Sequence, residues 1–588
     1  SHIHAIMGLT RRGNSGRSGI GGRDRLKDRL KDVFVSTRPD PRPDLLAEAD
    51  SALDKYHLLI SSLQTEASGN FQDPRESKQM LKMLPADVLA EMTGRAAERG
   101  ANRTPEIQEI WQQVEFDLLL HRGKYNDSLT CAQKLLTSRR ERLGEKHDAV
   151  ATALKNVACA QNGVGKDADA LDTHQKVLDL RRELLGEEHP SVAESLKFVG
   201  EALDYMRREE EALQIKQQAL DLYCKLFGDT HLAVADCYES IGYTLSSLYR
   251  EHECLELQKK ILAIRRSQLG EKHFDVAESY VAVGVTLLDL EQGQESLTML
   301  QKAFDIFYEL LGEAHPKTAE CYSLKADTLD FLGRFKDALK MQQKSLNILL
   351  SLYGEKHPFV EDGYAYVAGA LGALDRHEEA LENMEKAMRL TLERLGNDEE
   401  QFSVADCYED VGMILHDLGR YSEALEKVEK ALEIRCKVFG QEHIDVSHSY
   451  AAVGRVLSSL ERENEALDMH QLALDLRRKL MGDKQLLVAE SYFDVGGVLL
   501  DLDRPEEALT MLEKALSMRR ELLGEKSPAV AESCEMMGFV FDALDRRQES
   551  QDMFRKAASI AAETLGPNHP DTKSYQKNLG QPACCSLM

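Results

Sequence analysis

The sequence predicts an all-α solenoid built from antiparallel helix pairs, and three observations support this fold class. A hydrophobic residue followed by Gly recurs eleven times between Leu143-Gly144 and Leu565-Gly566, and nine of the ten spacings are 42 residues while one is 44. Apolar residues between these marks recur at helical spacing. Aromatic residues make up only 6% of the chain, which favours helices. Repeats of this length stack on their neighbours to bury a continuous core.

Each repeat is expected to contain two helices. The first, helix A, follows a turn such as residues 186–190 and is exemplified by residues 276–290. Pro190 fits its first position, where no backbone N–H is needed. The second, helix B, follows a short polar turn and is exemplified by residues 506–524. The Gly that ends helix B favours a left-handed C-cap.

Small residues recur where the two helices must approach each other closely. Gly inside a helix costs about 1 kcal/mol, so its recurrence in the middle of helix A indicates a close contact that offsets this cost. A Tyr column in helix A predicts core packing, with a ligand-stacking site as the alternative. The mid-helix column is Gly200, Gly242, Gly284, Gly412, Gly454, Gly496 and Gly538, with Ala158, Ala326 and Ala368, and the Tyr column is Tyr238, Tyr280, Tyr322, Tyr364, Tyr408, Tyr450 and Tyr492.

These columns resemble the tetratricopeptide repeat, in the 42-residue version found in kinesin light chains and nephrocystin-3-like proteins. The segments VAESYVAVG (276–284) and LGEKH (269–273), with the small residues Ser296 and Ala303, carry the resemblance. It implies a right-handed superhelical solenoid that binds other proteins. Kinesin light chains also have a long heptad region that binds the motor heavy chain, and this chain has no sustained heptads.

The repeat marks divide the chain into six parts. We expect a basic, disordered tail over residues 1–42, an N-terminal helical segment over 43–103 and a degenerate first repeat over 104–143. Ten repeats follow over 144–565, then a capping helix over 566–580 and a tail over 581–588. The single 44-residue spacing places a longer turn at 397–402, which either bends the stack and displays a loop or is a tolerated insertion.

Composition excludes several classes of protein. The net charge of −26 argues against a general nucleic-acid binder. We find no apolar run long enough to cross a membrane and no secretory signal. Eleven Cys without a C-x-x-C pair fit a reducing cytoplasm. The chain starts at Ser1, so it is either a fragment or carries residues upstream of a start at Met7.

No residue pattern indicates catalysis, a cofactor or a metal. The turns present one His per repeat, which spreads these side chains along the stack, whereas a metal needs several ligands converging at about 2 Å. We therefore expect structural roles for these histidines and no enzymatic activity. The turn histidines are His147, His189, His231, His273, His315, His357, His443 and His569.

Acidic residues form a column six positions before the mid-helix small residue. One interpretation is an acidic concave face that prefers basic peptides. The alternative is that these acids offset the helix dipole and pair with the Arg that ends the previous helix B. The acids are Glu194, Asp236, Glu278, Glu320, Asp362, Asp406, Glu490 and Glu532, and the arginines are Arg139, Arg181, Arg265, Arg435, Arg477 and Arg519.

The resemblance also implies an Asn in helix A that clamps a peptide backbone, and among the full repeats only Asn156 keeps it. An Asn ladder along an extended peptide is therefore not expected, and a folded partner is an equal alternative.

The last residues match a lipidation pattern. Cys585-Ser586-Leu587-Met588 fits the C-a-a-X prenylation motif, in which a terminal Met favours farnesyl, and Cys584 offers a second lipid site. The favoured function is a non-enzymatic scaffold or adaptor that binds other proteins. The alternatives are a kinesin-light-chain-type cargo adaptor and a farnesylated, membrane-attached signalling scaffold.

Overall fold

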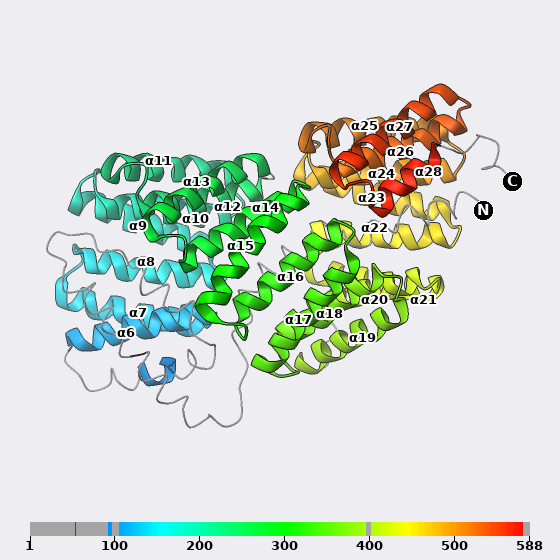
Figure 1. Ribbon diagram of the computed structural model, residues 1–588. Coiled ribbons are helices and arrows are strands. Elements are labelled where there is room, and N and C mark those ends of the chain that lie inside the picture. The colour runs from blue at the N-terminus through cyan, green and yellow to red at the C-terminus, as the bar shows by residue number, and fades with distance from the viewer. Residues whose placement is uncertain (1–52, 54–91, 97–104, 249, 396–400, 580–588) are drawn as a thin grey trace. The chain divides into compact units, whose positions relative to one another are not determined.

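The computed structural model describes residues 53, 92–96, 105–248, 250–395 and 401–579. Within these ranges the chain is α-helical, with short turns between helices (Figure 1). The helices are α6 (Pro105–His121), α7 (Tyr125–Leu143), α8 (Asp148–Gly163), α9 (Asp167–Leu185), α10 (Pro190–Tyr205), α11 (Glu209–Phe227), α12 (Leu232–Ser247), α13 (Glu251–Leu269), α14 (Phe274–Asp289), α15 (Gly293–Leu311), α16 (Pro316–Phe331), α17 (Phe335–Tyr353), α18 (Pro358–Gly372), α19 (His377–Arg394), α20 (Phe402–Asp417), α21 (Tyr421–Phe439), α22 (Ile444–Ser459), α23 (Glu463–Met481), α24 (Leu486–Asp501), α25 (Pro505–Leu523), α26 (Pro528–Ala543), α27 (Arg547–Thr564) and α28 (Pro570–Asn578).

Even-numbered helices are the predicted helices A, and odd-numbered helices are the predicted helices B. Helix α14 covers 274–289 and α25 covers 505–523, so the two example helices are confirmed to within two residues. The chain divides into two compact units between Val283 and Gly284, inside α14. From α6 to α13 and from α15 to α28 each helix packs against the next, which makes an all-α repeat solenoid.

The turn histidines are helix N-caps. In each of the eight, the imidazole Nδ1 accepts a hydrogen bond from the backbone N–H two residues later, as His147 does from Ala149 at 3.1 Å. Ser527 does the same with its hydroxyl. A side-chain acceptor at this position satisfies one of the free N–H groups of the first turn.

The Gly that ends helix B has a more restrictive conformation than the predicted left-handed cap. At Gly144 φ is 79°, but ψ is 174°. The sequence-based prediction was therefore wrong about ψ. Positive φ with extended ψ is a region that is essentially open to Gly alone. This restriction explains why the mark is Gly in every repeat.

Close helix contacts occur at most mid-helix Gly residues. A Cβ added to Gly496 would lie 2.8 Å from Leu512 Cγ, and one added to Gly412 would lie 2.7 Å from Val428 Cγ1. Gly242 is the exception, because only Cys254 Sγ lies near, at 3.7 Å. The predicted close approach is thus confirmed at Gly496 and Gly412.

The Tyr column packs in the core or at its edge. Tyr280, Tyr322 and Tyr492 are buried, and the other four are half-buried. A helix B lysine covers several of these rings, with Lys386 Nζ 4.4 Å from the ring centre of Tyr364 and Lys344 Nζ 5.1 Å from that of Tyr322. A cation over an aromatic face is attracted by the ring quadrupole. These contacts favour the packing role over a ligand site.

Several sequence predictions lie outside the described residues. They are the tail over 1–42, most of the segment over 43–103, most of the longer turn at 397–402, and the lipidation residues Cys584 and Cys585. None of the described helices combines the length and the apolar character that a membrane span needs.

Candidate interaction surfaces

The column of eight acids lies at the start of the A helices, and none of the eight is fully exposed. Four of them form an ion pair with a helix B arginine. Arg181 lies 2.9 Å from Glu194, and Arg519 lies 3.0 Å from Glu532. The other two pairs are Asp236 with Arg265 and Asp406 with Arg435. Glu320 pairs with Lys317 of its own helix.

Each arginine of these four pairs is buried, and each ties two repeats together. Arg435 donates to Asp406 at 2.8 Å in its own repeat and to Ser449 Oγ at 2.6 Å in the next. Fixed carboxylates and hydroxyls around a buried guanidinium offset the free-energy cost of removing it from water. The charge of these acids is thus largely satisfied within the chain. The acidic concave face formed by the whole column stays a prediction.

A serine fourteen residues after the arginine completes this junction, and the sequence interpretation missed it. The signal was present, because Ser follows five of the six arginines at that spacing. Repeats that carry Tyr223 or Phe307 in place of Arg have Cys237 or Cys321 in place of Ser. The hydrogen-bonded pairs are Arg181–Ser195, Arg265–Ser279, Arg435–Ser449, Arg477–Ser491 and Arg519–Ser533.

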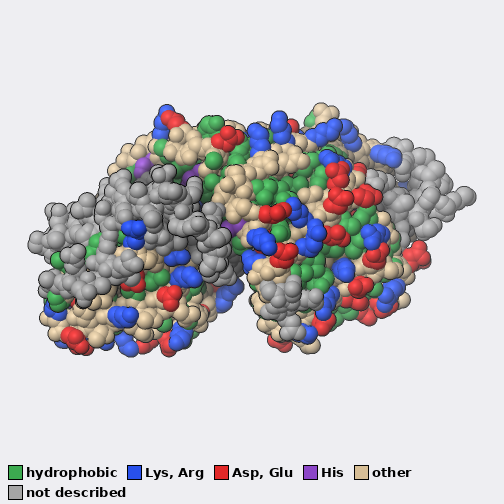
Figure 2. Space-filling model, turned by 90° about the horizontal axis from the view of Figure 1, so that it is seen from below, with side chains coloured by type: hydrophobic (Ala, Val, Ile, Leu, Met, Phe, Trp, Pro, Cys, Tyr) green, Lys and Arg blue, Asp and Glu red, His purple; other side chains and the backbone are tan. Residues whose placement is uncertain are grey.

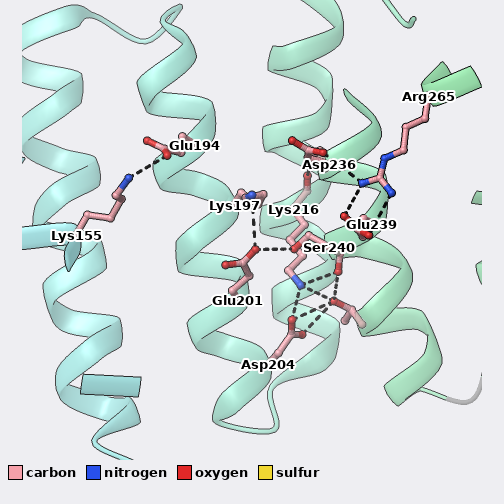
Figure 3. A network of polar contacts seen from close by, with 12 residues as sticks. Lys155, Glu194, Lys197, Glu201, Asp204, Lys216, Asp236, Glu239, Ser240 and Arg265 are labelled. Carbon is pink, nitrogen blue, oxygen red and sulfur yellow. Dashed lines mark hydrogen bonds and ion pairs between the residues drawn. The ribbon is translucent and has the colours of Figure 1, made fainter. Parts of the chain in front are cut away.

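The unit that ends at Val283 holds a second polar feature in its core. Lys216 of α11 is 0% exposed and forms an ion pair with Asp204 of α10 (Figure 3). Its Nζ also donates to Thr244 Oγ1 at 2.8 Å and to the Ser240 carbonyl at 2.9 Å. Burial raises the pKa of Asp204, although Lys216 acts in the opposite direction. Lys216 fills the space left by Gly200, where Leu300, Val428, Leu512 and Phe554 stand in four other repeats and His470 in another.

Around this core, charged side chains pair within one A helix, between neighbouring A helices, and between an A helix and the helix B that follows it. Lys155 lies 3.1 Å from Glu194, and Lys197 lies 3.8 Å from Glu201 (Figure 3). Glu239 lies 2.8 Å from Arg265. On the face shown in Figure 2, acidic and basic side chains are likewise interspersed rather than separated.

Two tyrosines of the same unit project into solvent beside these charges. Tyr205 is 47% exposed at the end of α10, and Tyr243 is 51% exposed on α12. Surrounding protein raises the pKa of Tyr205, and the nearby groups that add to this shift include Glu201 and Tyr243. The sequence interpretation did not single out this pair.

Sequence profiles of the tetratricopeptide repeat match most of the described chain. The matched residues are 117–182, 163–225, 275–351, 359–437, 403–479, 447–521 and 487–563, and a second profile of the same repeat matches 234–275. The chain belongs to the tetratricopeptide repeat family.

Solved structures similar to this tetratricopeptide repeat protein are distant in sequence. BtubC (BKLC) from P. vanneervenii is 22% identical, with a TM-score of 0.32 over 40% of this chain and 92% of that one. A putative kinesin light chain repeat protein from Podosopora anserina is 19% identical, with a TM-score of 0.31 over 35% and 98%. The apo form of RapI is 17% identical, with a TM-score of 0.36 over 49% and 98%. No curated protein matches the chain.

The candidate peptide-clamp residue of this tetratricopeptide repeat protein already has a partner. Asn156 is 4% exposed, and its amide donates to Gln113 Oε1 at 2.8 Å. Asn578, one residue before the end of the described chain, makes the same contact with Glu535 at 2.7 Å. Both contacts join successive A helices. A clamping role for Asn156 stays a prediction, and it requires that the Gln113 contact be exchanged for a peptide.

The described residues contain no cluster of three or more His, Cys, Asp or Glu side chains arranged to hold a metal ion. The cysteines in the described ranges are all free thiols. Burial raises the pKa of Cys131 and of Cys237 to about 12, so these thiols are protonated and unreactive at neutral pH.

Proposed function

We propose that this tetratricopeptide repeat protein is a non-enzymatic, cytoplasmic scaffold or adaptor that binds basic segments of its protein partners. The observation that carries the proposal is the pair of half-exposed tyrosines, Tyr205 and Tyr243, beside Glu201. The rest of the charged network is largely satisfied within the chain, whereas these rings offer surface to a partner.

The chemistry of this face suits a cationic side chain. Tyr gives a large contact area at low cost in conformational entropy, and its ring attracts Lys and Arg. The carboxylates Glu194, Glu201, Asp236 and Glu239 lie beside Lys155, Lys197 and Arg265 (Figure 3), and Arg181 also pairs with Glu194. Because these charges nearly balance, the attraction for a basic segment comes from the rings, from Glu201 beside them and from the net charge of −26 of the chain.

Binding of fluorescent Arg- and Lys-rich peptides to the full chain tests the proposal. The double variant Tyr205→Ala/Tyr243→Ala should weaken binding about tenfold or more, the range expected for aromatic anchors. The control is Tyr308→Ala, because Tyr308 is 46% exposed on α15 and belongs to the other compact unit. Equal affinities for the double variant and the control, or equal binding of Glu-rich peptides, would refute the proposed site.

Two narrower functions are further candidates. The 42-residue repeat favours a kinesin-light-chain-type cargo adaptor, and co-purification with a kinesin heavy chain tests this candidate directly. The C-terminal Cys-Ser-Leu-Met sequence favours a farnesylated, membrane-attached signalling scaffold.

A further inference from the structure

Two turns near the start of the unit over 284–579 contact two turns near its end. The Ser527 hydroxyl donates a hydrogen bond to the Glu291 carboxylate, across 236 positions of the chain. The His569 ring lies near the Phe331 backbone and against Gly333, which is also 236 positions away. Because both contacts span the same number of positions, two successive repeats at the start of the unit contact two successive repeats at its end, in the same order.

These contacts bury side chains that are otherwise open to solvent in this fold. His569 is buried, whereas the other seven N-cap histidines are exposed or partly buried. Ser527 is buried too, and it stands where most repeats have the N-cap His. Ser527 and His569 are thus the two N-cap residues that other turns of the unit cover, and they are also the two that are buried.

The turn that contacts His569 has a glycine, Gly333, at the point where the ring approaches. A Cβ added to Gly333 would lie 2.7 Å from the His569 ring, so only Gly allows this approach. Gly419 holds the same position in the turn between α20 and α21, with a similar φ of 74°, and no atom lies within 4 Å of an added Cβ there. The close approach belongs to Gly333 and is not a general property of the turn.

We propose that the Ser527–Glu291 and His569–Phe331/Gly333 contacts form a clasp that closes residues 284–579 on themselves. The clasp holds the spacing between the first and last repeats of this unit. A partner that stretches the unit must break both contacts, so the clasp sets a free-energy threshold for such binding. It lies in a different unit from the Tyr205–Tyr243 face and does not depend on the function proposed there.

Hydrogen exchange of the full chain tests the clasp, because the readout lies far along the chain from the substitution. Gly333→Ala should raise exchange in residues 566–579 about tenfold, the factor that corresponds to 1.4 kcal/mol. Gly419→Ala carries the same backbone strain without the collision and should leave exchange there unchanged. Equal exchange in 566–579 for the two variants would overturn the proposal.

A second pair of variants decides the matter if Gly333→Ala fails to fold. Glu291 and Glu461 both have left-handed backbones, with φ of 61° and 58°, so Gly relieves strain at either position. Glu291→Gly should raise exchange in residues 525–531, because it removes the Ser527 contact. Glu461→Gly should not change exchange there. No difference between these two variants would show that the turns do not touch in solution.

Discussion

At the residue scale, single buried charges decide how one repeat joins the next. The Arg435 guanidinium joins an acid of its own repeat to a serine of the next repeat, so one side chain fixes both neighbours. The sequence suggested that the acids pair with the arginine of the previous helix B, and Glu194 and Glu532 do so, whereas Asp236 and Asp406 pair with the arginine of the following helix B. The serine column is visible in the sequence, but its partner and the N-cap role of His147 could not be predicted, because a hydroxyl or an imidazole in a column does not by itself show which group it reaches.

Asp330 gives the clearest pH-dependent prediction. Burial, with the nearby charge of Asp327, raises its pKa to about 7, and in the described structure its Oδ1 is buried without a hydrogen-bond partner. Asp327, whose charge adds to this shift, accepts a hydrogen bond from Gln342. Between the unfolded pKa of 3.8 and the folded value, the native state holds a proton that the unfolded state has lost. The free energy of unfolding therefore falls as pH rises through this range, by up to about 1.4 kcal/mol per pH unit.

Asp330→Asn should remove this contribution and stabilise the protein by about 1–3 kcal/mol at pH 8. Urea unfolding of both proteins between pH 4 and pH 8 measures the difference. The two stabilities should diverge as pH rises, with the variant the more stable at the alkaline end. Parallel curves across the whole range would contradict the assignment.

At the element scale, helix pairing depends on small residues more than on intrinsic helix propensity. The helix bounds and the pairing were predictable from the 42-residue period, because the small residues mark the crossing points directly. The depth of each crossing was not predictable. Gly242 and Gly496 occupy the same column, yet only Gly496 has a side chain pressed against it.

This difference predicts opposite effects for one substitution. Gly242→Ala should stabilise the chain by about 0.5–1 kcal/mol, because Ala is the better helix former and a Cβ fits there. Gly496→Ala should destabilise it by about 1–3 kcal/mol, because the Cβ would lie 2.8 Å from Leu512 Cγ. Thermal unfolding followed by circular dichroism measures both. If both variants shift the midpoint in the same direction, the packing at this column differs from that described.

At the scale of the whole molecule, the fold follows from the sequence because one local rule repeats many times. The same period recurs in each repeat, so a wrong assignment in one repeat does not change the predicted architecture. The tyrosines of the proposed binding face belong to no column, since Ser247 stands one repeat after Tyr205 and Val285 one repeat after Tyr243. The contacts at Glu291 and Gly333 join segments 236 positions apart, beyond the reach of a 42-residue pattern. The proposed binding face and the proposed clasp thus both depend on residues that do not follow the repeat pattern.

We expect the location of the whole molecule to depend on the Cys585-Ser-Leu-Met sequence, which belongs to no repeat. We predict farnesylation of Cys585 in eukaryotic cells, seen as a gain of one farnesyl group with loss of the last three residues in the intact mass. One lipid gives only marginal membrane binding, so a stable membrane fraction also requires a second lipid on Cys584. Cys585→Ser should abolish both the mass gain and the membrane fraction, whereas Cys584→Ser should keep the farnesyl mass and reduce membrane binding. An unmodified mass for the unsubstituted protein would instead leave a cytoplasmic scaffold.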